Sequence, residues 1–146
     1  MRRTGVDTTV LVYAHVPGFA QHAAARAFLR ALLERSDAAL AVTPMILHEL
    51  VHVITDARRF DPPVPMGEAL EVARRYLGRS NVECLAVDEE AMARALELLE
   101  QHQLGRRRVA DCLLAATLLR HGVRELATYN PDDFRVFAEL SVVVPA

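Results

Sequence analysis

The chain reads Thr4-Gly5-Val6-Asp7-Thr8-Thr9-Val10-Leu11-Val12-Tyr13-Ala14 near its start. Residues 4–7 form a short run that ends in an acid, and we expect this run to be a β-strand. The hydroxyl side chains at positions 8 and 9 are typical helix N-caps, so a helical turn is predicted over residues 10–14. A strand that passes directly into a helix is a building unit of α/β folds.

The rest of the chain repeats this alternation of short β-type runs and longer helical runs. Further strands are predicted at residues 39–42, 82–87 (as a buried strand), 125–129 and 141–144, and helices at 21–35, 45–58, 68–77, 89–103 and 109–121. Residues 61–65 read Asp-Pro-Pro-Val-Pro, a stiff linker that no helix can cross. Strands separated by helical crossovers imply an α/β fold with a mostly parallel central sheet, covered by helices on both faces.

Composition places the chain among ordinary globular domains. Its 146 residues are 52% hydrophobic and 25% charged, and we expect one domain over residues 1–146. Cys84 and Cys112 lie far apart, which makes a disulfide framework unlikely and favours a reducing compartment. No apolar run has the roughly 20 residues of a membrane span, and the N-terminus does not resemble a signal peptide. We therefore expect a cytoplasmic protein without a membrane segment.

Charge is distributed unevenly along the chain. The net charge of −2 argues against a protein that coats nucleic acid non-specifically. All 17 basic residues are arginines, and residues 101–124 hold five of them against one acid. Three are consecutive, Arg106, Arg107 and Arg108. This cluster is either a solvated face or the rim of a phosphate-binding site.

Four acids follow or lie close to predicted strand ends: Asp7, Glu49, Asp111 and Asp133. Ligands of parallel sheets bind beyond the carboxyl ends of the strands, so these acids converge on one rim if the strands are neighbours. Taken singly, most have a structural explanation as helix caps, helix N-terminal anions or turn residues. Glu49 stands out, because its apolar neighbours leave its helix little exposed face to spare.

Clustered carboxylates need compensation. They repel one another and raise each other's pKa, and burial without a partner is costly. A hard divalent cation removes this conflict, and an all-oxygen site with open positions suits Mg²⁺ or Mn²⁺. Such ions serve phosphoryl chemistry. The arginines at 106–108 precede Asp111 directly, where they are placed to hold a substrate backbone.

The chain resembles PIN-domain ribonucleases, and among them the VapC-type toxins of toxin–antitoxin pairs. The resemblance spans nearly the whole chain and rests on residues 6–14, the mid-helix Glu49, the run Arg-Val-Ala-Asp-Cys-Leu-Leu-Ala-Ala-Thr around Asp111, and Leu-Ala-Thr-Tyr-Asn-Pro-Asp-Asp-Phe around Asp133. It implies a three-layer α/β/α sandwich and an endoribonuclease that uses Mg²⁺ or Mn²⁺ to activate water. It also implies a homodimer and a small VapB-like antitoxin that occupies the site.

The same resemblance assigns roles to residues. Asp7, Glu49, Asp111 and Asp133 would hold the metal, with Thr8 and Thr128 as hydroxyl neighbours that orient carboxylates or water. Many members carry an acid where this chain has Asn130. We therefore expect Asp133 rather than Asp132 to complete the site, with Asn130 as a hydrogen-bonding neighbour, and a site of three carboxylates remains an alternative.

A competing motif overlaps this site. His48-Glu49-Leu50-Val51-His52 is an H-E-x-x-H pattern, which on a helix places two histidines on one face for Zn²⁺ and uses the Glu as the general base of a metallopeptidase. Third ligands would come from Glu68, Glu71 or His102. The prolines at 62–65 interrupt the path to Glu68, and the peptidase hypothesis leaves three acids unexplained. A third hypothesis, a catalytically inactive PIN-like binding module, conflicts with the intact acids.

Overall fold

The computed structural model describes all 146 residues. Its centre is one sheet of five strands in the order β3-β2-β1-β4-β5, and every neighbouring pair is parallel. The strands are β1 (Arg2–Val6), β2 (Ala38–Val42), β3 (Val82–Cys84), β4 (Glu125–Ala127) and β5 (Ser141–Val143). The predicted mostly parallel sheet is confirmed, and the strands that precede the first and last acids, β1 and β4, are neighbours.

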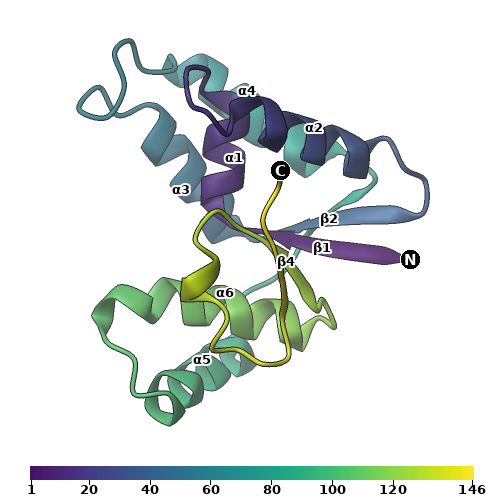
Figure 1. Ribbon diagram of the computed structural model, residues 1–146, viewed down its shortest axis with the longest axis vertical. Coiled ribbons are helices and arrows are strands. Elements are labelled where there is room, and N and C mark those ends of the chain that lie inside the picture. The colour runs from purple at the N-terminus through teal and green to yellow at the C-terminus, as the bar shows by residue number, and fades with distance from the viewer.

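Helices cover both faces of the sheet (Figure 1). One layer contains α1 (Thr8–His15), α2 (His22–Leu33), α3 (Pro44–Ile54) and α4 (Met66–Gly78), and the opposite layer contains α5 (Glu89–Gln101) and α6 (Val109–Arg120). Two short 3₁₀ helices, η1 (Arg106–Arg108) and η2 (Pro131–Asp133), precede α6 and follow β4. The predicted three-layer α/β/α sandwich is therefore confirmed.

Strand β1 packs closely against α6 at Gly5. A Cβ atom at Gly5 would lie 2.7 Å from both terminal methyl carbons of Leu118, which is fully buried in α6. Directly after β1, the carboxylate of Asp7 accepts a hydrogen bond from the backbone N–H of Thr8 and so caps α1. These contacts set the position of the first acid between the two helical layers.

Two predicted elements end three or more residues earlier than expected. The predicted buried strand at 82–87 is only Val82–Cys84, lies at the sheet edge and is not buried: Cys84 is exposed and Glu83 pairs with Arg3. The helix predicted to reach residue 58 ends at Ile54, because the Asp56 carboxylate accepts the backbone N–H of Arg58 and forms a turn there. Cys84 is exposed, Cys112 is buried, and neither forms a disulfide. No helix has the length and apolar character that crossing a membrane requires.

Candidate active site

The predicted acids lie around the carboxyl edge of the sheet. A cavity of about 570 Å³ opens there, beyond the end of β1 and between α1, α3 and the start of α6. Its lining includes Asp7, Glu49, Asp111 and Asn130. Three of the four predicted carboxylates thus share one cavity, although they come from three separate elements of the chain.

Asp7 is held by three hydrogen bonds. Its Oδ1 accepts the Thr8 backbone N–H at 2.8 Å, while Oδ2 accepts the hydroxyls of Thr128 at 2.8 Å and Thr9 at 3.1 Å. Burial raises the pKa of Asp7, and the three hydrogen bonds act in the opposite direction because they favour the charged form. The carboxylate therefore has a fixed orientation.

The hydroxyls around Asp7 also join two parts of the chain. The buried Thr128 hydroxyl accepts the Asn130 backbone N–H at 2.9 Å, and the Thr9 hydroxyl accepts the Tyr129 backbone N–H at 3.1 Å. The hydroxyl of Thr8, by contrast, is buried without a partner. Thr9 was not among the predicted site residues. The signal for it in the sequence is its position two residues after Asp7, within the helical turn that Asp7 caps.

Asp111 lies in the first turn of α6. Burial raises its pKa to about 6, and the negative charges of Asp7 and Asp133 act in the same direction. Arg108, one turn earlier, places its Nε 3.3 Å from Oδ2 of Asp111 and opposes this rise. Burial first, and then the charges of two neighbouring acids, thus favour the protonated form of Asp111.

The fourth acid lies beside the cavity rather than in its lining. Asp133, at the end of η2, is half-buried, and its charge raises the pKa of both Asp7 and Asp111. Asp132 is exposed and pairs with Arg135 instead. Asp133, not its neighbour, is thus the acid of η2 that interacts with the site.

Glu49 reaches the cavity from α3, but not as a buried group. Its side chain is exposed, so the expectation that this helix has little exposed face was wrong. The helix packs through Ile46, Leu47, Leu50 and Ile54 and leaves the face between these residues open. Glu49 is therefore free to turn toward the other acids.

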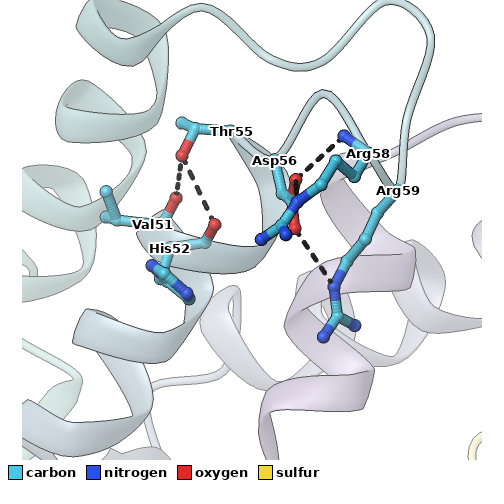
Figure 2. A network of polar contacts seen from close by, with 6 residues as sticks. All are labelled: Val51, His52, Thr55, Asp56, Arg58 and Arg59. Carbon is cyan, nitrogen blue, oxygen red and sulfur yellow. Dashed lines mark hydrogen bonds and ion pairs between the residues drawn. The ribbon is translucent and has the colours of Figure 1, made fainter.

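Two arginines line the same cavity, Arg59 and Arg107. Figure 2 shows the turn after α3, where the carboxylate of Asp56 lies between the side chains of Arg58 and Arg59. Arg107 belongs to the predicted cluster, in which Arg106 and Arg107 are exposed and Arg108 is mostly covered. Arg59 was not predicted, because only the turn at Asp56 directs it back to the acids.

The H-E-x-x-H pattern is divided between two cavities. His48 and His52 line an apolar groove of about 530 Å³ between α3 and α4, together with Cys84, whereas Glu49 lines the acidic cavity. None of the suggested third ligands, Glu68, Glu71 and His102, lines that groove. A zinc peptidase needs both histidines and the Glu at one metal, so this arrangement does not support one.

The acidic cavity offers oxygen donors only, the type that Mg²⁺ and Mn²⁺ prefer. Nowhere in the chain are three or more His, Cys, Asp or Glu side chains already grouped closely enough to hold a metal ion. The donor types and the mutual repulsion of the acids thus fit a hard divalent cation, but the acids must draw together to bind it.

Comparison with known proteins identifies the fold. The family model described as the PIN domain matches residues 6–140. The chain belongs to the PIN-domain family. Among curated relatives, this PIN domain is 33% identical to ribonuclease VapC24 of Mycobacterium tuberculosis over 132 residues, which cover 90% of this chain and 89% of the relative. It is 28% identical to ribonuclease VapC33 of the same organism over 141 residues, 95% of each chain.

Solved structures agree with this assignment. Mycobacterium tuberculosis VapC20, described as a Sarcin-Ricin loop cleaving toxin, superposes with a TM-score of 0.71 at 17% identity, over 92% of this PIN domain and 95% of that chain. VapBC2 from Rickettsia felis, bound to a DNA fragment from its promoter, superposes with a TM-score of 0.67 at 19% identity, over 99% of each chain. At these identities the structures establish the shared fold.

Proposed function

We propose that this PIN domain is a divalent-metal-dependent endoribonuclease and the toxin of a VapBC-type toxin–antitoxin pair. The observation that carries the proposal is the grouping of Asp7 and Asp111 at one cavity, where burial and like charge raise the pKa of both. Groups arranged in this way occur at functional sites, because the fold alone gains nothing from the repulsion. The similarity to two curated ribonucleases agrees with this conclusion.

The acids and hydroxyls of the cavity have different proposed roles. Asp7 and Asp111 would hold Mg²⁺ or Mn²⁺, with Glu49 turning in from α3 and Asp133 completing the acidic set. The bound ion supplies the Lewis acidity that activates water and stabilises charge on phosphate oxygens. Thr9 and Thr128 fix the orientation of Asp7 through their hydroxyls.

The RNA backbone needs positive charge beside these acids. Arg59 and Arg107 line the cavity, and Arg106 is exposed next to it. A guanidinium group matches the geometry of a phosphate, and each such contact neutralises one backbone charge. We assign this row of arginines to the RNA strand on either side of the cleaved bond, and Asn130 to a polar contact at the cavity wall.

The antitoxin partner is proposed from the relatives, since solved structures such as the Rickettsia felis VapBC2 complex contain toxin–antitoxin pairs. A second cleft, of about 560 Å³, separates α2 from α4. Apolar side chains line it together with two acids, Glu34 and Glu68, and four arginines, Arg26, Arg30, Arg75 and Arg79, so its charged lining has an excess of arginine. This lining suits an amphipathic segment with acidic side chains. A toxin that cleaves cellular RNA would act in the cytoplasm.

We further propose a homodimer. The groove between α3 and α4 has a predominantly apolar lining, and Met66, Leu70 and Leu77 beside it are exposed. Exposed apolar patches of this kind mark protein–protein contacts. Analytical ultracentrifugation of the wild-type chain and of Leu77→Glu tests this assignment: a dimer that the charged variant dissociates supports it, and a wild-type monomer contradicts it.

Cleavage of RNA tests the enzymatic proposal. Total RNA is incubated with the purified chain, with and without a chelator, and new 5′ ends are mapped by sequencing, so that no substrate has to be known in advance. Asp7→Asn and Asp111→Asn should abolish the new ends, as should the chelator. The control Asp37→Asn removes an exposed acid that pairs only with Arg35 and should cleave as wild type does. Normal cleavage by either site variant would contradict the proposal.

A further inference from the structure

The side chain of Arg108 differs from those of Arg106 and Arg107 in its burial and in its hydrogen bonding. Its side chain is only 21% exposed, and its Nε and Nη2 atoms are shielded from water without any hydrogen-bond partner. Buried donors are almost always paired in proteins, because leaving them unpaired costs free energy. These two atoms can therefore donate hydrogen bonds to an acceptor that does not belong to the protein.

Arg108 is held at the site mainly by charge, because its contact with Asp111 lacks good hydrogen-bond geometry. Its one ion pair, at 3.3 Å, joins Nε to Oδ2 of Asp111. Arg3 shows the contrast: its Nε and Nη2 donate to the two carboxylate oxygens of Glu83 at 2.8 and 2.7 Å, and Nη1 donates to a backbone carbonyl. The contact of Arg108 is single and longer, so it is easier to displace than the bidentate pair of Arg3.

The ion pair of Arg108 lies at the proposed metal site. Among the four acids of the site, Asp111 alone has an ion-pair partner, and that partner is Arg108. The charges of Asp7 and Asp133 add to that of Asp111, and among the nearby arginines only Arg108 forms an ion pair with one of these acids. A divalent cation offers the same acids more charge and direct coordination.

We propose that Arg108 is the resident counter-ion of the acidic site, that a divalent cation displaces its guanidinium from Asp111, and that this competition sets the metal affinity. The inference rests on the metal-dependent function proposed above. Once displaced, Nε and Nη2 are free to donate to a phosphate oxygen of the substrate. Metal binding and substrate binding are then coupled, because the ion releases the group that binds the phosphate.

Calorimetric titration with Mn²⁺ tests the competition without any RNA. The metal-free wild type is compared with Arg108→Gln, which keeps most of the side-chain volume and removes the charge. Arg108→Lys keeps the charge, and Arg107→Gln removes an exposed charge from the lining of the acidic cavity. We expect Arg108→Gln to bind Mn²⁺ about tenfold more tightly than wild type. The other two variants should stay within about twofold, because Arg108→Lys keeps the charge and the exposed charge of Arg107 is screened by salt.

The outcomes separate the two proposals. A wild type that fails to bind Mn²⁺ overturns the proposed metal site and this inference with it. A wild type that binds, beside an Arg108→Gln variant that binds equally or more weakly, overturns this inference alone. Circular dichroism of each metal-free variant verifies the fold, and wild-type affinity in Arg108→Lys shows that charge, rather than packing, causes the effect.

Discussion

The hydroxyl of Thr128, directly after β4, donates a 2.8 Å hydrogen bond to Oδ2 of Asp7, directly after β1. Both residues stand at the carboxyl ends of neighbouring parallel strands, so the pairing of the strands brings them together. Because Thr128 also accepts the Asn130 backbone N–H, one buried hydroxyl links the orientation of the first acid to the path of the chain toward Asp133.

Thr128→Val should therefore weaken metal binding. The substitution keeps the shape of the side chain but removes a hydrogen bond that favours ionised Asp7, and loss of such supporting contacts costs about 10–100-fold in metal affinity. Calorimetry with Mn²⁺ measures the change. Thr117→Val is the control, because its buried hydroxyl donates only to the Leu113 carbonyl within α6. Equal affinities for the two variants would refute the positioning role of Thr128.

Replacing Arg106 and Arg107 together by Gln should flatten the salt dependence of RNA binding. Both side chains are exposed beside the acidic cavity. Each phosphate contact on a single strand contributes roughly 0.7 to the slope of log affinity against log salt, so the double variant should lose about 1.4. Filter binding in an Asp7→Asn background prevents cleavage, and Arg94→Gln on α5 is the control. An unchanged slope would show that these arginines do not contact RNA phosphates and form only a solvated surface.

Stability should fall in mild acid because of His15. Its Nε2 lies 2.7 Å from the Tyr76 hydroxyl, and burial, aided by the charges of Arg75 and Arg26, lowers the pKa of His15 to about 4. The unfolded chain binds a proton at this ring near pH 6.5, whereas the folded chain resists it down to pH 4. The contribution to stability is therefore fully present above pH 6.5 and is lost as the pH falls from 6.5 to 4.

Urea denaturation of wild type and His15→Gln at pH 7.5 and 4.5 measures this effect. The glutamine is neutral at both pH values, so wild type should lose about 2 kcal/mol more than the variant between them. The comparison cancels the contribution of the carboxyl groups, which also changes with pH in this range. Parallel losses in the two proteins would show that His15 does not titrate differently in the folded state.

Gly5→Ala should destabilise the fold by about 1–3 kcal/mol, the usual cost of overpacking a core. The added methyl would lie 2.7 Å from the terminal carbons of Leu118, which has no exposed surface along which to move. Gly67→Ala in α4 is the matched control, since a methyl there meets nothing within 4 Å. Thermal melting of the two variants decides: equal midpoints would mean that β1 and α6 are not in tight contact.

Much of this arrangement follows from local sequence. The parallel sheet was predicted from the helical crossovers between the strands. The edge of the sheet around which the acids lie was predicted from the strand-to-helix passage at Asp7 and the apolar helix that contains Asp111. Local patterns failed where the answer depends on tertiary packing. The exposure of Glu49 and its separation from His48 and His52 depend on which faces of α3 contact the core and α4, and the proximity of Arg59 depends on a turn.

Metal specificity tests the central claim most directly. Metal-free wild type, Asp111→Asn and His52→Ala are each titrated with Mn²⁺ and with Zn²⁺ in a calorimeter, which requires no knowledge of the RNA target. The carboxylate site predicts that Mn²⁺ binds to wild type and to His52→Ala, and that Asp111→Asn abolishes binding. Tight Zn²⁺ binding that depends on His52 and is unaffected by Asp111→Asn would contradict the account.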